Sequence, residues 1–102
     1  MKQIDNFIDG AYVGGSRRFD KRSPLNNHII ASVAEAGRSE VDAAVQAARA
    51  ALAGPWGKLA VNERVDLLYG VANEINRRFD EFLEAECADT GKPMSLARHI
   101  DI

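Results

Sequence analysis

The sequence has few of the residues that mark secreted, metal-binding or membrane proteins. Cys87 is its single cysteine, so a disulfide within the chain is excluded, and one free thiol fits a reducing compartment. Residues 1–6 contain no apolar run of the kind that a secretion signal needs. The longest uncharged apolar stretches fall far short of the about 20 residues that span a membrane. We therefore expect a cytoplasmic protein without a membrane partner.

The chain also lacks an excess of positive charge. The net charge is −2 at pH 7, with 13 basic and 15 acidic residues, so no large positive field would concentrate nucleic acid around the protein. The one basic cluster lies at residues 17–22 and has Phe19 inside it. A nucleic-acid site there would bind in a salt-dependent way, but an exposed edge strand protected by charge explains the cluster more simply. We expect no nucleic-acid partner.

No motif for binding a nucleotide or a metal cluster is present. Gly10, Gly14 and Gly15 do not form a dinucleotide-binding fingerprint, because no strand–turn–helix unit surrounds them. A phosphate-binding loop is missing as well. His28 and His99 are too few, and too far apart in the sequence, to form a metal cluster with the cysteine. These residues indicate no cofactor-binding position.

The one candidate nucleophile, Cys87, lacks the neighbours that would activate it. An active thiolate needs a nearby histidine, a cation or the start of a helix. Acidic residues surround it instead, at Glu84, Glu86 and Asp89, and it falls late in a predicted helix, near the negative end of the helix dipole. We interpret it as a helix-packing residue and expect no catalytic residue in the chain.

What the sequence does contain is a globular composition, with 46% hydrophobic and 27% charged residues. Residues 1–36 predict strands and turns. The Asp9-Gly10 pair favours a hairpin turn between two short apolar segments, because these residues tolerate positive φ angles. A short edge strand is expected at residues 18–22, ended by Ser23-Pro24, and a further strand at residues 29–34.

Residues 39–102 predict amphipathic helices, because apolar side chains recur there at helical spacing. The expected starts are Ser39 with Asp42 as a capping pair, Asn62, Asp80 and Pro93, and the expected ends of the first and third helices are Gly54-Pro55 and Gly91. A hairpin with one further strand is too small a sheet to cover these helices. We therefore expect an incomplete fold that continues after residue 102.

Several segments, taken in order, resemble the beginning of the aldehyde dehydrogenase superfamily. They are Phe7-Ile8-Asp9-Gly10, Ser23-Pro24 with Ile29 to Val33, Val41 to Ala51, Trp56, Glu63-Arg64 and Leu67-Leu68, and Asp89-Thr90-Gly91-Lys92-Pro93. No single motif is decisive, but the series covers essentially the whole chain. The resemblance implies an α/β fold in which strands and amphipathic helices pack onto a Rossmann-like cofactor domain, with residues 1–102 as its first part.

Three later segments, at residues 79–87, 95–97 and 99–102, narrow the resemblance. They are similar to the branch that contains the 2-hydroxymuconic and 2-aminomuconic semialdehyde dehydrogenases. This likeness implies a parent enzyme that uses NAD to oxidise a semialdehyde to a dicarboxylate during the degradation of aromatic compounds. It also implies a homodimer or homotetramer with a small aldehyde as substrate.

The family mechanism, as the resemblance implies it, is covalent. A cysteine thiolate attacks the aldehyde, hydride passes to the nicotinamide, and a water activated by a glutamate hydrolyses the thioester. These groups lie beyond residue 102 in the family, and Cys87 matches a helix position outside the active site. The resemblance therefore assigns no catalytic and no cofactor-binding residue to this chain, which alone should be inactive.

One site of the family falls on residues of this chain. The resemblance implies a structural monovalent cation between the Asp101 carboxylate and the backbone carbonyl groups of Lys21 and Arg22. Oxygen ligands suit a hard cation, although the two basic side chains do not. The alternative is that Asp101 is an ordinary helix carboxylate.

A different class of function also stays open. The chain could be a stand-alone helical protein-interaction module without catalysis, which would bind a partner through the apolar faces of its helices.

Overall fold

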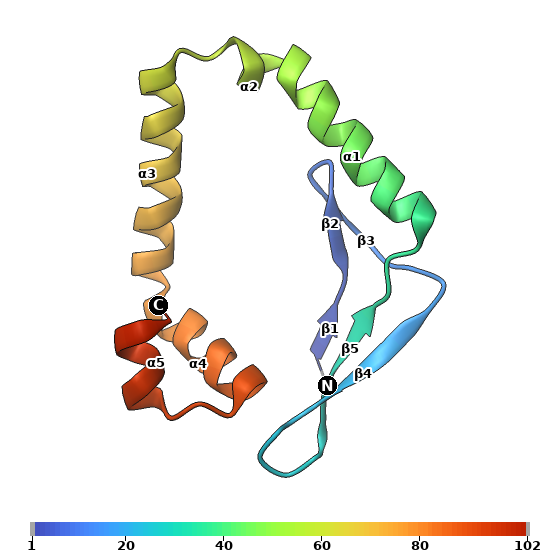
Figure 1. The fold of residues 1–102 in the computed structure, drawn as a ribbon, viewed down its shortest axis with the longest axis vertical. Helices are drawn as coiled ribbons and strands as arrows, with labels where there is room; N and C mark the ends of the chain where they lie inside the picture. The colour runs from blue at the N-terminus through green and yellow to red at the C-terminus, as the bar shows by residue number, and fades with distance from the viewer. Residues whose placement is uncertain (1, 102) are drawn as a thin grey trace. The chain divides into compact units, whose positions relative to one another are not determined.

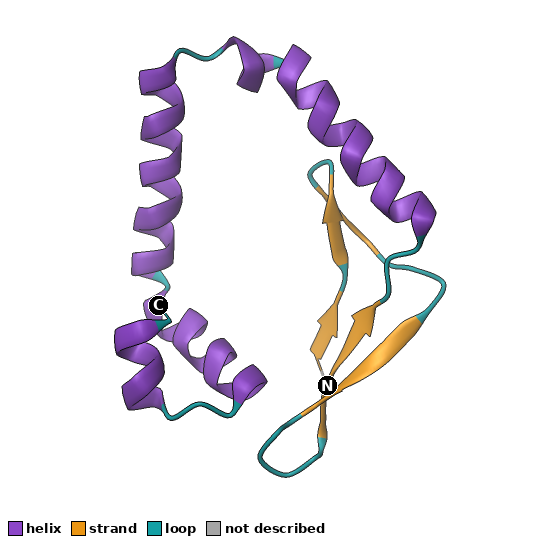
Figure 2. Ribbon diagram, viewed as in Figure 1, coloured by secondary structure: helices purple, strands orange, loops and turns teal. Residues whose placement is uncertain are grey.

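The computed structural model describes residues 2–101 and contains both strands and helices, as expected (Figures 1 and 2). Its backbone divides into two compact units. The first unit holds the residues up to 22 together with residues 29–59, and the second holds residues 23–28 together with the residues from 60 onward. All the strands belong to the first unit, so each unit is described in turn.

The first unit is built on a sheet of three strands, β1 (Lys2–Ile4), β5 (Ile29–Ala34) and β4 (Arg18–Arg22), in that spatial order. The β4 strand runs antiparallel to β5, while β1 runs parallel to it. The expected strands at residues 18–22 and 29–34 are confirmed, and β4 does lie at an edge. The β1 strand was not predicted, because three residues are too few to show a period.

A hairpin of β2 (Asn6–Ile8) and β3 (Ala11–Val13) stands beside this sheet. Its two-residue loop is the predicted Asp9-Gly10 pair, whose φ angles are +51° and +78°. Positive φ at both loop residues matches the right-handed twist of the two strands. The local chemistry of these two residues therefore fixed the turn.

The first unit continues into α1 (Arg38–Ala53) and the short α2 (Pro55–Lys58), which Gly54 separates. The start of α1 differs from the expected Ser39 cap, since Gly37 is the N-cap and its N–H donates to Glu40 Oε2 at 2.8 Å. A glutamate at the third helical position can satisfy this backbone group whatever side chain the cap carries.

The second unit contains α3 (Val61–Arg77), α4 (Phe79–Thr90) and α5 (Met94–Ile100). The predicted end of α4 is confirmed, because Gly91 has φ +73° and its N–H donates to the Cys87 carbonyl at 2.9 Å. The N-caps of α3 and α4 lie two residues before the expected Asn62 and Asp80, at Ala60 and Arg78. Pro93, which was expected in the first turn of the last helix, is the N-cap of α5.

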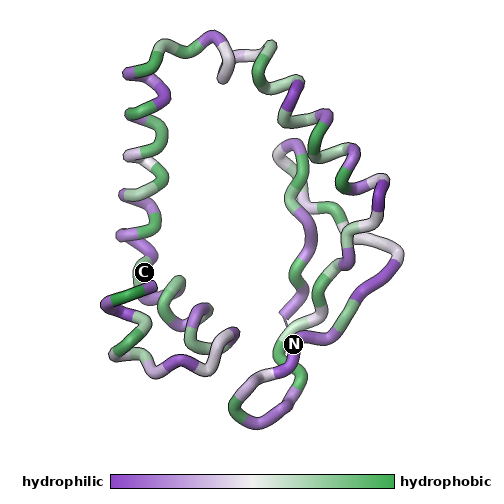
Figure 3. The backbone as a smooth tube through the Cα atoms, viewed as in Figure 1, coloured by the Kyte–Doolittle hydropathy of each residue, from purple (hydrophilic) through white to green (hydrophobic). Residues whose placement is uncertain are grey.

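Few side chains of either unit are buried. In the second unit Leu83 of α4 and Ala97 of α5 are fully buried, whereas α3 has no buried residue. Hydrophobic positions nevertheless recur along the whole of α3 (Figure 3). None of the helices that the structure describes has the length and apolar character needed to cross a bilayer.

Candidate functional site

The three residues expected to hold a cation lie in different units. Lys21 and Arg22 are neighbours at the end of β4 in the first unit, and Asp101 follows α5 in the second. Lys21 pairs with Ala31 and Arg22 with Ile29, so the ladder has a bulge between Lys21 and Arg22. The extra residue of this bulge is Ile30 on β5, and Lys21 and Arg22 each keep a partner across the ladder.

The Asp101 carboxylate already has a positive partner. Its Oδ2 accepts a hydrogen bond from Lys92 Nζ at 2.7 Å, and the two side chains are only 22% and 31% exposed. This hydrogen bond is the main reason that the pKa of Lys92 is raised above its ordinary value. Asp101 Oδ1 makes no hydrogen bond to any residue between 2 and 101. One carboxylate oxygen therefore remains for a further ligand.

The loop between α4 and α5 places Lys92 for this contact. Gly91 turns the chain in the left-handed conformation, and the next residue, Lys92, donates its N–H to Thr90 Oγ1 at 3.2 Å. The Thr90 hydroxyl in turn donates to the Glu86 carbonyl at 2.8 Å. Sequence reasoning did not find the Lys92–Asp101 pair, because nine residues separate the two and neither lies on the other's helix face.

The remaining candidates form no reaction centre. Cys87 is half-buried in α4, while His28 in the 23–28 turn and His99 on α5 are exposed. Within the described chain, no three His, Cys, Asp or Glu side chains gather in a way that could hold a metal ion. The oxygen ligands expected for a monovalent cation are mostly backbone carbonyls, so this finding does not bear on that site.

Arg18 organises the sheet, which the sequence did not indicate. Its Nε and one terminal nitrogen donate to the hydroxyl and carbonyl oxygens of Ser32, both at 2.8 Å. Its other terminal nitrogen donates to Asp5 Oδ1 at 2.7 Å, and a longer bond of 3.3 Å reaches the Ile4 carbonyl. One residue of the basic cluster thus ties β4 across β5 to the end of β1.

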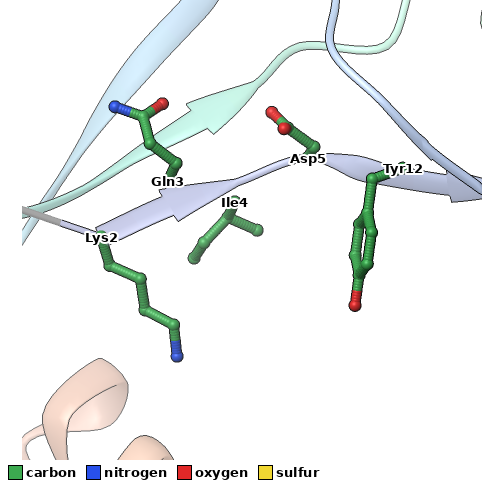
Figure 4. Close-up of a pocket in the computed structure, with 5 residues that line it drawn as sticks. All are labelled: Lys2, Gln3, Ile4, Asp5 and Tyr12. Carbon is green, nitrogen blue, oxygen red and sulfur yellow. The ribbon is translucent and has the colours of Figure 1, made fainter.

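A cavity of about 550 Å³ lies along β1. Figure 4 shows Lys2, Ile4 and Tyr12 directed to one side of the strand, and Gln3 and Asp5 to the other. Its lining has one ammonium group and one carboxylate, and the carboxylate is held by Arg18. No histidine, cysteine or pair of carboxylates lines it, so this open cavity offers no general base or nucleophile.

Two further grooves suit packing rather than chemistry. One, of about 290 Å³, lies on α3 and is lined by Val65, Leu68, Tyr69 and Ala72. The other, of about 190 Å³, lies where α1 passes β2. Asn6 lines that second groove, and its Nδ2 is buried without a hydrogen-bond partner among the described residues. An unpaired buried donor is costly, so this groove suits a segment that brings a carbonyl group.

Comparison with known proteins gives these elements a family. The sequence model of the Aldehyde dehydrogenase family matches residues 12–102. A 2-hydroxymuconic semialdehyde dehydrogenase from Pseudomonas sp. (strain CF600) is 64% identical over the whole chain. A 2-aminomuconic 6-semialdehyde dehydrogenase from Pseudomonas sp. is 50% identical, and a human 2-aminomuconic semialdehyde dehydrogenase 36% identical, again over the whole chain. The chain spans about a fifth (21%) of the length of each of these curated relatives.

Solved structures agree with the sequence relatives. The NAD⁺ complex of an aldehyde dehydrogenase from Bacillus cereus matches 98% of this chain with a TM-score of 0.93 and 36% sequence identity. The match covers 21% of that structure. The strands and helices described above therefore have the arrangement of the corresponding part of an aldehyde dehydrogenase, and the chain belongs to the aldehyde dehydrogenase family.

Proposed function

We propose that this chain is the amino-terminal part of an NAD-dependent dehydrogenase that oxidises 2-hydroxymuconic semialdehyde to the dicarboxylate during aromatic-compound degradation. The observation that carries the proposal is the 64% identity, over the whole chain, to a relative of that name. The identity to the 2-aminomuconic relative from Pseudomonas is lower, at 50%. This difference favours the hydroxy substrate over the amino substrate.

In this proposal residues 1–102 form the first part of the cofactor-binding domain, and NAD belongs to the longer parent enzyme. The NAD⁺ complex of the Bacillus cereus relative supports the choice of cofactor. Among the described residues no glycine-rich turn joins a strand to a helix in the dinucleotide-binding manner, so we assign no cofactor contact to this chain. We further propose that the parent is cytoplasmic and assembles as a homodimer or homotetramer.

The chain alone should be inactive. Cys87 is its one thiol, and no histidine or lysine hydrogen-bonds to it within the described residues. A covalent mechanism needs an activated thiolate and donors that stabilise the oxyanion. We place these groups in the rest of the parent enzyme.

The test is NAD-linked turnover by the full-length enzyme. The reduction of NAD is followed by absorbance. We expect kcat/KM to be higher with 2-hydroxymuconic semialdehyde than with 2-aminomuconic semialdehyde. The 102-residue chain serves as the control and should give no turnover. Activity confined to simple aliphatic aldehydes would contradict the substrate while leaving the family in place, and turnover by the 102-residue chain would contradict our interpretation of Cys87.

We also propose that the parent holds a structural monovalent cation with the Asp101 carboxylate and the carbonyl groups of Lys21 and Arg22. The proposal follows from the family to which the chain belongs, and the chemistry of the donors is compatible with it, because a carboxylate and backbone carbonyl groups are hard oxygen ligands. The cation would supply positive charge that holds these oxygens together. It takes no part in the oxidation of the aldehyde.

A further inference from the structure

We propose that the groove between β2 and α1 receives a segment of the parent enzyme's own chain from beyond residue 102, which presents a backbone carbonyl group to Asn6 Nδ2. The inference rests on the proposed function only in taking this chain as part of a longer enzyme. It makes the β2–β3 hairpin a docking element for the rest of the same subunit, and it gives Asn6 a partner that the sequence did not indicate.

The side-chain amide of Asn6 carries this inference. Its Nδ2 is buried and has no hydrogen-bond partner among residues 2–101. In folded proteins the large majority of buried side-chain polar atoms have a partner, because a buried donor that is left unpaired costs free energy. The amide therefore needs an acceptor that the described residues do not supply.

The walls of the groove are apolar apart from Asn6 and one acid. That acid is Glu40, and its Oε2 accepts the Gly37 N–H at 2.8 Å, where it caps α1. The other lining residues are Phe7, Ile8, Ala36, Val41 and Ala44. A suitable occupant therefore brings one acceptor and an otherwise apolar surface, which a backbone carbonyl group beside an aliphatic side chain provides.

Apolar side chains on both walls are open to water. Phe7 on β2 is 65% exposed and Val41 on α1 is 52% exposed, whereas Asn6 and Ile8 are half-buried on the same face of β2. The strand and the helix contact each other (Figure 1). A segment in the groove would remove this apolar surface from water, which favours docking in addition to the hydrogen bond.

The parent's own chain is a better occupant than a second subunit. The described residues span 21% of the length of a curated relative, so most of the parent lies outside them. The groove measures about 190 Å³, whereas a stable interface between proteins buries about 800 Å² on each partner. A groove this small suits one chain segment. A partner from the same chain also pairs the amide while the subunit folds, before any assembly step.

Photo-cross-linking of the full-length enzyme identifies the occupant. Val41 is replaced by an aliphatic amino acid that carries a diazirine ring, and the irradiated protein is digested and analysed by mass spectrometry. Probe-bearing subunits are assembled with an excess of ¹⁵N-labelled wild-type subunits, so the mass of each linked peptide shows its subunit of origin. We expect unlabelled peptides from beyond residue 102.

The same probe at Gln46 is the matched control for the cross-link. Gln46 is an exposed residue of α1 that does not line the groove. A probe at this position should react mainly with water and should link far less peptide from beyond residue 102 than the probe at Val41.

A substitution at Asn6 tests the hydrogen bond. Asn6→Leu keeps the approximate size of the side chain and removes its amide. With a carbonyl group bound there, the substitution leaves that carbonyl buried and unpaired, so the Tm of the full-length enzyme should fall by about 2 °C or more. An amide without a partner predicts the opposite sign, because replacing an unpaired buried polar group by an apolar one is neutral or stabilising. Gln46→Leu makes the same exchange on the exposed side of α1 and should leave the Tm nearly unchanged.

Each outcome decides one part of the inference. Labelled peptides would assign the groove to a neighbouring subunit and overturn it, as would links confined to residues 1–102 or no link to protein. An unchanged or higher Tm for Asn6→Leu would overturn the hydrogen bond. The cross-link leaves Asn6 intact, so it decides the docking even where Asn6→Leu does not fold. Turnover of 2-hydroxymuconic semialdehyde by the wild type is assayed separately, and its absence would contradict the proposed substrate while leaving this inference in place.

Discussion

Arg18 and Ser32 illustrate how single side chains hold the first unit together. Ser32 lies in the central strand and is only 8% exposed, and its two oxygens both accept hydrogen bonds from Arg18. The guanidinium group suits this role because its donors form a rigid planar fork. A buried polar group that has lost its partner costs more than the hydrogen bond itself contributes.

Replacing Arg18 by Ala in the parent enzyme should therefore lower the free energy of unfolding by about 1–3 kcal/mol. Chemical denaturation followed by circular dichroism measures the change. Arg17→Ala is the matched control, since Arg17 is 3.7 Å from Glu35 and both side chains are well exposed; it should change stability by less than about 1 kcal/mol. Equal losses in the two variants would contradict the role given to Arg18.

Gly91 is the second residue whose identity the backbone dictates. Its φ is +73°, and an added Cβ would lie 3.0 Å from Pro24 Cγ. We expect Gly91→Ala to lower stability by about 1–2 kcal/mol, because an L-residue is strained in the left-handed region. Gly70→Ala offers a contrast within α3, where nothing lies within 4 Å of the added Cβ; it should raise stability by up to about 1 kcal/mol. A lower Tm for Gly91→Ala and a higher Tm for Gly70→Ala would confirm both statements.

Among the elements, α1 has a start that depends on pH. The pKa of Glu40 is lowered from its ordinary value of 4.5, first by its own backbone N–H, then by the Gly37 N–H and by Ser39. The folded form thus binds the proton less readily than the unfolded chain does. The contribution of Glu40 to stability is full above pH 4.5 and is lost as the pH falls through the lower, folded-state pKa.

Glu40→Gln should consequently destabilise the parent enzyme above pH 4.5 and have little effect at still lower pH. Gln at this position can still accept from the Gly37 N–H, so the variant tests the charge and spares the hydrogen bond. Urea denaturation of both proteins at a series of pH values measures the difference. A difference that grows as the pH falls would contradict the assigned direction of the pKa shift.

At the scale of the whole molecule, many large hydrophobic side chains of the described residues are exposed to water. On α3 alone, Val61, Leu67, Leu68, Tyr69 and Val71 are each more than half exposed. Exposed apolar patches of this kind mark surfaces that bind other protein. The rest of an aldehyde dehydrogenase would supply such a partner, since this chain spans 21% of the length of its relatives.

The isolated 102-residue chain is accordingly expected to bind a hydrophobic dye strongly and to melt without a cooperative transition. The full-length enzyme should bind far less dye per molecule and melt cooperatively. Fluorescence titration and calorimetry measure the two properties. A compact 102-residue monomer that melts cooperatively and excludes the dye would contradict the placement of this chain in a larger cofactor domain.

The sequence predicted the features that depend on local chemistry. Asp9-Gly10 and Gly91 are residues that tolerate positive φ angles, and these turns lie where they were expected. Helix starts were displaced because several residues near each start can cap it, and the glutamates at 40 and 63 decided the outcome for α1 and α3. The family, too, could be identified from the ordered segments.

Contacts between distant residues could not be predicted. Arg18 and Asp5 are 13 residues apart, and Lys92 and Asp101 are nine apart with a turn between them. Neither pair follows a helical or strand period, so the presence of opposite charges was not enough to predict either contact. The same holds for the pairing of β1 with β5, which depends on the fold and not on three residues of sequence.

That parallel pairing has a practical consequence for handling the protein. Lys2, Gln3 and Ile4 occupy one flank of β5, so an affinity tag fused directly ahead of them would crowd a strand that the sheet requires. Deletion of these three residues would remove the neighbour of β5 on that side. The exposed edge of β5 would then be prone to aggregation. A tag at the opposite terminus of the full-length enzyme, or a flexible spacer at this one, avoids the hazard.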